Sequence, residues 1–318
     1  MFSDRKKSKY AESFPLTYQC TFVQDRQEIF MITLIDGLSL GSIYALIALG
    51  YTMVYGIAKM LNFAHGDIIM VGAYAILVAM TTTGNPLVGV VASIIVCTLL
   101  GVLIEKSAYK PLRGASPLAV LITAIGVSYL LQSLAQLIFE SKSKPVPGWR
   151  FGDIPFLKAY GINTSAVVTL VAGAIIMIAL TVFINVTRTG RAMLAVSEDR
   201  DAAKLMGINV NRIITITFAI GSALAAFAGM FYLLQIPNAE PTLGAMPGIK
   251  AFTAAVIGGI GSIPGAMLGG ILLGVIEKFC LSVPVLAPYT TALEFSLLIV
   301  ILLVRPTGIL GKKLREKV

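Results

Sequence analysis

Residues Pro86–Ile104 read PLVGVVASIIVCTLLGVLI, a run without a single charged side chain. A helix needs about 20 apolar residues to cross the hydrocarbon core of a bilayer, and this run reaches that length. Backbone groups in lipid must bond within their own segment, and the strands of a β-barrel would alternate in polarity. The run therefore predicts a transmembrane helix, and it decides the fold class of the chain.

Similar charge-poor runs recur at Gly37–Ala58, Pro117–Phe139, Ser165–Arg188, Ile213–Ile236 and Ala251–Ile276. The composition agrees with them, since 57% of the 318 residues are hydrophobic, 13% are charged and the mean hydropathy is +0.86. Soluble domains are far less apolar. We expect an all-α polytopic membrane protein with about eight transmembrane helices.

The positions of the basic residues predict which loops face the cytoplasm. The formal charge of +9 comes from Lys and Arg at the ends of apolar runs rather than on one soluble face, which argues against nucleic-acid binding. Fourteen basic residues fall inside if the loops around 59, 106–113 and 188–212 and the C-terminal tail are cytoplasmic. Six then fall outside, namely Lys142, Lys144, Arg150, Lys158, Lys250 and Lys278. This bias fits the positive-inside rule, although the 140–164 loop weakens it.

Parity then predicts a broken segment. Between the inside loop 188–212 and the inside tail the chain must cross an even number of times, yet only three apolar blocks follow, at 213–236, 251–278 and 290–304. The middle block carries a Gly/Pro break at 258–265, where one half-helix would end and another begin. We expect 251–278 to be a broken or re-entrant hairpin. One kinked helix with small residues for close packing is the alternative.

Residues 1–30 fit this topology poorly. The tail would lie outside although it carries Arg5, Lys6, Lys7 and Lys9, and it lacks the hydrophobic region of a secretory signal. An apolar segment starts directly after it at Met31. A start codon set too early would explain both facts. We therefore divide the chain into a tail over 1–30 that need not be native and a single transmembrane domain over 31–318.

No catalytic constellation is found in the sequence. There is no GxxxxGK[ST] phosphate loop, the three cysteines lack paired spacing and His65 is the only histidine, so neither a metal site nor a cofactor is expected. Glu105 and Glu277 fall at span ends, where carboxylates reach water. Glu294 lies about five residues inside an apolar run, where a charge is costly enough to make it a functional candidate.

Two other features mark the apolar runs. The stretch Leu61–Asp67 interrupts two of them with hydrogen-bonding side chains and a glycine, as discontinuous helices do at transporter substrate sites. An interfacial turn capped by Asn62 is the alternative. Gly37–Ser42 has the small residues of a tight helix contact. The breaks at 62–66 and 258–265 are expected to meet near the membrane midplane. The translocation-path candidates are Tyr44, Asn62, His65, Gly66, Ser262 and Glu294.

Several motifs together resemble a known family. They are Gly37-Leu38-Ser39-Leu40-Gly41-Ser42-Ile43-Tyr44-Ala45-Leu46, Asn62-Phe63-Ala64-His65-Gly66, Gly190-Arg191-Ala192 with Ala202-Ala203-Lys204-Leu205-Met206-Gly207-Ile208, and Arg305-Pro306-Thr307-Gly308. These are similar to motifs in permease subunits of high-affinity branched-chain amino acid ABC importers. The resemblance covers residue 31 to the C-terminus. Related permeases for urea, short amides and some sugars share parts of it.

The resemblance implies an ABC importer permease fold in the bacterial inner membrane. It also implies a transport subunit that is not itself an enzyme and that works with a second homologous permease, two cytoplasmic ATPases and an extracytoplasmic substrate-binding protein. Asp201-Ala202-Ala203-x3-Gly207 is similar to the EAA-x3-G coupling motif, with Asp in place of Glu and without the downstream IxLP half. The ATPase-coupling candidates in the loop 188–212 are Glu198, Asp199, Asp201, Ala202, Ala203 and Gly207.

Two other classes of membrane protein fit the sequence less well. An ion-coupled secondary transporter would place ionisable groups at mid-membrane, and only Glu294 qualifies in the sequence. A membrane enzyme would need a convergent polar site, which the sequence does not offer. Neighbouring genes for ATPases and a secreted binding protein would separate these classes from an ABC importer.

Overall fold

Eight helices are long and apolar enough to cross a membrane in the part of the chain that the computed structural model describes, residues 16–149, 152 and 154–311. The strands described there, β1 (Lys144–Pro145) and β2 (Asn238–Ala239), form one short antiparallel pair. The expected all-α polytopic class is confirmed. The helices are α1 (Leu16–Ala58), α2 (His65–Thr83), α3 (Pro86–Ile104), the π-helical turn η1 (Glu105–Tyr109), α4 (Pro117–Phe139), α5 (Pro155–Ala159), α6 (Thr164–Val186), α7 (Arg188–Glu198), α8 (Arg200–Leu205), α9 (Val210–Gln235), α10 (Ala245–Gly258), α11 (Ile263–Ser282), the 3-10 turn η2 (Ala287–Tyr289) and α12 (Thr290–Val304).

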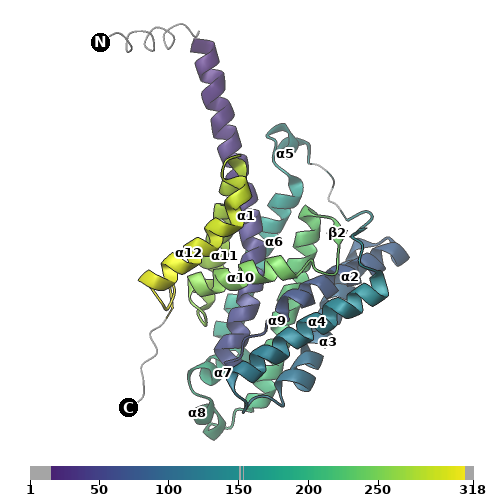
Figure 1. The fold of residues 1–318 in the computed structure, drawn as a ribbon, viewed down its shortest axis with the longest axis vertical. Coiled ribbons are helices and arrows are strands. Elements are labelled where there is room, and N and C mark those ends of the chain that lie inside the picture. The colour runs from purple at the N-terminus through teal and green to yellow at the C-terminus, as the bar shows by residue number, and fades with distance from the viewer. Residues whose placement is uncertain (1–15, 150–151, 153, 312–318) are drawn as a thin grey trace.

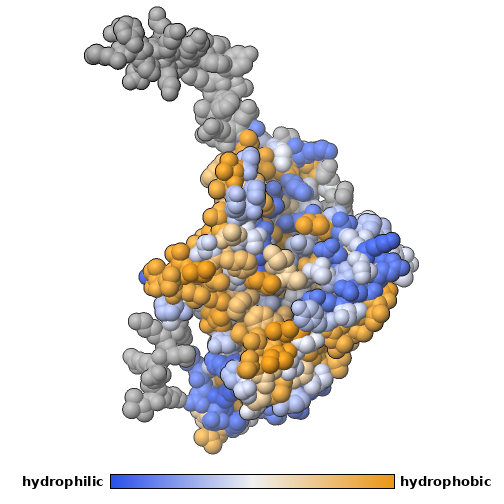
Figure 2. All heavy atoms as spheres, in the orientation of Figure 1, coloured by the Kyte–Doolittle hydropathy of each residue, from blue (hydrophilic) through white to orange (hydrophobic). Residues whose placement is uncertain are grey.

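The helices surround α1. In Figure 1, α11 and α12 lie on one side of α1, α2, α3 and α4 lie on the other, and α10 crosses α1, while α7 and α8 form one end of the bundle. Figure 2 shows hydrophobic residues over much of the flank and hydrophilic residues gathered at the α7–α8 end. This distribution is the one that a lipid-embedded bundle requires. The chain is a multi-pass membrane protein.

Polar caps fix where several spans begin. Asn85, Ser116, Asn163 and Ser262 each accept a hydrogen bond from a backbone N–H in the first turn of α3, α4, α6 and α11, respectively. Proline also occupies the first turn of α3, α4 and α11, where its missing N–H leaves no hydrogen bond unmade. The apolar runs predict the helices, and these caps set their first residues.

Glycines bring α1 and α11 into close antiparallel contact. A Cβ added to Gly41 would lie 2.7 Å from Ile271 Cα, and one added to Gly37 would lie 2.9 Å from Val275 Cα. Gly274 on α11 meets Gly41 in the same way, because a Cβ there would overlap the backbone of α1. The tight contact predicted for this part of α1 is confirmed.

The predicted Gly/Pro break separates α10 from α11, and the two helices are unequal. α10 has 14 residues and is about 20 Å long, too short to cross a bilayer alone. α11 has 20 residues, which is long enough. Gly259 (φ 110°) and Gly261 (φ 93°) form the turn between them in a backbone conformation that favours glycine. The broken hairpin is confirmed, but the expectation of two half-helices is wrong because α11 has the length of a full span.

The segment after α12 returns to cap α10. The N–H groups of Ile309 and Leu310 donate to the carbonyls of Ile257 and Gly258, both at 2.9 Å. The last carbonyls of a helix have no partner inside it, so these bonds supply what α10 lacks. The closing motif singled out in the sequence therefore ends in a structural contact with the broken hairpin.

Three charged residues lie elsewhere than predicted. Glu105 is fully buried and Glu277 is 9% exposed, so neither reaches water at a span end. Lys250 is buried on α10 rather than exposed in an outside loop, because α10 begins at Ala245, before the apolar block that predicted it. The sequence predicted that these carboxylates are hydrated, whereas in the structure they contact other side chains of the protein, described below.

No helix end lies at residue 30, where the sequence predicts the boundary between the tail and the transmembrane domain. α1 runs without interruption from Ala58 back to Leu16. Residues 1–15 lie outside the described part of the chain. The proposed native start near Met31 stays a prediction.

Candidate coupling and translocation sites

The predicted coupling segment forms two short helices, α7 and α8, that meet at a corner. Asp199 caps α8, accepting hydrogen bonds from the N–H groups of Asp201 and Ala202 at 3.0 and 3.1 Å. Gly207 follows the helix with a φ of 82°, and its N–H donates to Lys204 O at 3.0 Å. The predicted helix, with its acidic first turn and its terminal glycine, is present.

The coupling candidates differ in their surroundings. Ala203 is buried against the bundle, whereas Ala202 and Gly207 are exposed. Asp201 pairs with Lys204 at 3.0 Å, but both side chains are largely exposed, so the pair adds little to stability. Glu198, the last residue of α7, is also exposed. One alanine of the motif therefore faces inward, and the acidic residues face outward.

Sequence reasoning missed the apolar tip of α8. Leu205 is 89% exposed and Met206 is 82% exposed. An open groove of about 310 Å³ lies beside this tip, lined by Lys204, Gly207, Ile208, Asn209, Val210 and Asn211. Two adjacent large apolar side chains exposed at a hydrophilic end make this tip a candidate interaction surface. The signal was present in the sequence, as two apolar residues directly before the glycine that ends the helix.

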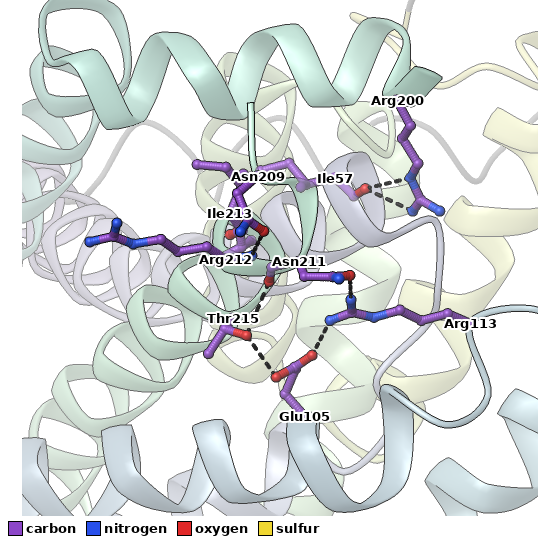
Figure 3. Close-up of polar contacts among 10 residues, drawn as sticks. Ile57, Glu105, Arg113, Arg200, Asn209, Asn211, Arg212, Ile213 and Thr215 are labelled. Atoms are coloured by element: carbon purple, nitrogen blue, oxygen red, sulfur yellow. Dashed lines mark hydrogen bonds and ion pairs between the residues drawn. The ribbon is translucent and has the colours of Figure 1, made fainter. Parts of the chain in front are cut away.

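Behind this segment, a polar network joins η1 to α9 (Figure 3). Arg113 contacts both Glu105 on η1 and Asn211 on α9. Glu105 also accepts a hydrogen bond from Thr215 Oγ1 at 2.9 Å. Glu105 therefore has two partners in place of water, and π-helical turns such as η1 occur frequently at functional sites.

The break between α1 and α2 is buried. Asn62 Oδ1 accepts a hydrogen bond from Tyr109 OH at 2.8 Å, so the side chain faces η1. The N-cap position of α2 is Ala64, without a side-chain hydrogen bond, and the alternative of a turn capped by Asn62 is not what the structure has. His65 is 1% exposed and packs edge-on to Tyr51 with ring centroids 4.8 Å apart. Its Nε2 atom has no hydrogen-bond partner in the described part of the protein.

The two breaks contact different parts of α10. Gly66 packs against Gly244 and Gly248 at the start of that helix. Ser262 lies beyond its other end, half-buried, where it caps α11 by accepting from Gly265 N–H at 3.3 Å. Phe63, also in the first break, packs against Phe252 in the middle of α10 with ring centroids 5.4 Å apart. The first break therefore lies along α10 and the second follows its end, and the expectation that they meet near the midplane stays a prediction.

Tyr44 and Glu294 are brought to one buried charged cluster. Lys250 Nζ lies 2.6 Å from Glu277 Oε1 and 3.2 Å from Glu294 Oε2. Tyr44 OH donates to Glu277 Oε2 at 2.7 Å. The cluster brings one amino group, two carboxyl groups and a phenol together among α1, α10, α11 and α12. Ionisable groups inside a membrane bundle are functional candidates, so Lys250 and Glu277 join the candidates that the sequence offered.

Comparison with known proteins gives a consistent result. The family model described as "Branched-chain amino acid transport system / permease component" matches residues 33–303. The high-affinity branched-chain amino acid transport system permease protein BraD of Pseudomonas aeruginosa is 46% identical, covering 91% of this chain and 98% of the relative. The corresponding protein LivH of Escherichia coli is 44% identical over the same shares. The fructose import permease protein FrcC of Rhizobium meliloti is 35% identical over 41% of this chain and 38% of its own length.

Proposed function

The chain belongs to the family of branched-chain amino acid transport permease components, and we propose that it is the transmembrane subunit of an ATP-driven importer for leucine, isoleucine and valine in a bacterial inner membrane. The observation that carries the proposal is the family match, which extends over nearly the whole transmembrane domain. The subunit forms part of the translocation path and passes movement to it from ATPases.

Two parts of the structure support separate roles. The α7–α8 segment, with its apolar tip at Leu205 and Met206, offers a cytoplasmic partner a defined surface. The buried cluster of Lys250, Glu277 and Glu294 places charge inside the bundle, where a zwitterionic substrate needs polar groups. We assign coupling to the first region and the path to the second, together with the surroundings of Asn62, His65 and Gly66.

The partners follow from the same proposal. Two ATPases bind the α7–α8 ends, a second homologous permease completes the path, and a substrate-binding protein delivers the amino acid from outside. The relatives are transport permeases, and we infer that ATP hydrolysis belongs to the ATPase subunits. Hydrophobic side chains exposed on α3, α4 and α12 suit contact with lipid or with the second permease.

The experiment must distinguish three alternatives. The similarity to FrcC over part of the chain favours a sugar as the second candidate substrate, and related permeases for urea or short amides form a third class. The charged cluster alone would also suit an ion-coupled secondary transporter. Such a transporter, however, has no use for the α7–α8 surface.

Reconstitution tests these possibilities. The chain is purified together with its candidate partner permease, ATPases and binding protein, and uptake of labelled leucine, isoleucine and valine into proteoliposomes is measured. Uptake should require ATP and all partners, and excess fructose or urea should not compete. Uptake driven by an ion gradient without ATPases would contradict the proposal. Competition by fructose or urea would change the substrate class.

A further inference from the structure

The cytoplasmic end of α1 is finished in an uncommon way. The helix ends at Ala58, and Lys59 follows with a φ of 52°, a left-handed conformation that is usually taken by glycine. Lys59 N–H donates to Tyr55 O at 2.9 Å. The carbonyl of Ile57 is among the last four of the helix, which have no partner inside it.

Arg200, the first residue of α8, supplies that partner (Figure 3). Its Nη2 and Nε atoms donate to Ile57 O at 2.8 and 3.2 Å. Two N–H groups of one planar guanidinium fix both the distance and the direction of the contact. A positive charge is also favoured at a helix C-terminus, where the macrodipole is negative.

Arg200 keeps its charge although burial and neighbouring cations oppose it. Burial lowers the pKa of Arg200, and the nearby Arg113 lowers it further. Burial also lowers the pKa of Lys59, with Arg200 as the second cause. Arginine has an ordinary pKa above about 12, so Arg200 stays charged near neutral pH and keeps its donors.

The contact of Arg200 with Ile57 O joins α8 to the membrane-spanning helix α1 through hydrogen bonds. Asp201 and Lys204 pair with each other rather than with another helix. In the described part of the chain, no other side chain of α8 forms a hydrogen bond or ion pair with a membrane-spanning helix. α1 in turn contains Gly41, which packs on α11, and Tyr44, which contacts the charged cluster. A displacement of its end therefore acts on the centre of the bundle.

We propose that Arg200 is a positioning residue that carries the movement of α8 into α1 by holding the carbonyl of Ile57. The inference rests on the proposed function, because it takes α8 to be the part that an ATPase moves. Beyond the proposed function, the inference identifies Arg200 as the side chain that transmits the movement and α1 as the helix that is displaced.

The first test measures coupling in the reconstituted importer. Arg200→Met keeps an apolar stem of similar length but has no donor, whereas Arg200→Lys keeps a charged donor. We expect Arg200→Met to lower the number of amino acids transported per ATP hydrolysed about tenfold, the ratio that the loss of one charge-assisted hydrogen bond gives. Arg200→Lys should recover most of this ratio.

Arg212→Met is the matched control. Arg212 carries the same charge on the same end of the bundle and is exposed, and in Figure 3 its side chain points away from Ile57. Its substitution should leave the transport ratio unchanged. An unchanged ratio in Arg200→Met, in an importer whose wild-type form transports with ATP, would overturn the inference alone. A wild-type complex without ATP-dependent uptake would instead contradict the proposed function.

The second test does not depend on tolerance of the Met variant. Spin labels are placed on cysteines at Lys59 and Lys204, with Cys20, Cys97 and Cys280 replaced, and their distance is measured in nucleotide-free and nucleotide-trapped complexes. If α8 and the end of α1 move together, the distance stays constant while Arg200 is present and changes in Arg200→Met. A distance that already changes with Arg200 in place would overturn the inference.

Discussion

Lys250 on the short helix α10 forms an ion pair of 2.6 Å with Glu277 on the full-length helix α11. α10 is too short to be held by a full span of lipid, so it depends on contacts with the rest of the chain. These contacts include the glycine contact at Gly66, this ion pair and the cap from the C-terminal segment.

Removal of the Lys250 charge should destabilise the bundle. Lys250→Met leaves Glu277 and Glu294 buried without their cation, and breaking a buried pair in this way costs about 3 kcal/mol or more. We expect a lower melting temperature in detergent. Glu277→Gln and Glu294→Gln combined with Lys250→Met should restore much of the loss, whereas Lys142→Met in an exposed loop should have no effect. Equal melting of Lys250→Met and wild type would contradict the role of the cluster.

The α1–α11 contact gives a steric prediction. Gly41→Val adds atoms where even a Cβ would lie 2.7 Å from the backbone of Ile271, so the helices must separate. We expect a loss of about 3 kcal/mol in stability, at the upper end for overpacking. Gly126→Val is the control, because Gly126 is also helical but has open space around it. Similar melting of both variants would show that the contact tolerates separation.

The terminal glycine of α8 gives a conformational prediction. Gly207 has open space but a φ of 82°, so the strain of a substitution comes from the backbone alone. A left-handed conformation costs a β-branched residue about 1–2 kcal/mol, whereas Asn tolerates it better. Gly207→Val should insert normally but uncouple ATP hydrolysis from uptake, and Gly207→Asn should remain coupled. Equal coupling in both variants would show that the left-handed backbone conformation at Gly207 is not required for coupling.

Charge reversal tests the outward acidic face of the segment. Glu198 and Asp201 are both exposed, so changing both to Lys should not disturb the fold. If these residues face an ATPase, the double variant should reach normal membrane levels and lose stimulation of hydrolysis by substrate. Normal uptake at normal expression would count against the assignment.

Thiol labelling tests the position of the α10–α11 turn. On a background without Cys20, Cys97 and Cys280, Ser262→Cys should react with an impermeant maleimide only from the side that bears α7 and α8, since Ser262 is half-buried at that end. Ala266→Cys should be inert because Ala266 is fully buried. Labelling of Ser262→Cys from the opposite side would reverse the orientation assigned to the bundle.

The spans were predictable because each depends on local composition. The length of an apolar run such as Pro86–Ile104 predicts a span, and Asn85 followed by a proline predicts where that helix begins. The break at 258–265 was predictable for the same reason, since Gly and Pro act on the backbone at their own position.

The charged cluster was only partly predictable, because its members come from three helices. Glu294 stood out alone inside an apolar run, but nothing local indicates that Lys250 and Glu277 would face it. Lys250 lies before the apolar block of its helix, and the sequence therefore suggested a wet loop. The arrangement of the two breaks was not predictable for the same reason, because it depends on where α10 lies in space.

The cap that Ile309 and Leu310 provide for α10 has a consequence for biogenesis. These residues follow α12, so during translation they leave the ribosome only after all eight spans have been made. Until then the carbonyls of Ile257 and Gly258 lack the hydrogen bonds from Ile309 and Leu310, and the α10–α11 hairpin is incomplete. The membrane domain thus reaches its final form only once this late segment has emerged, and a nascent chain that stalls before it would present an unfinished interior to membrane quality-control proteases.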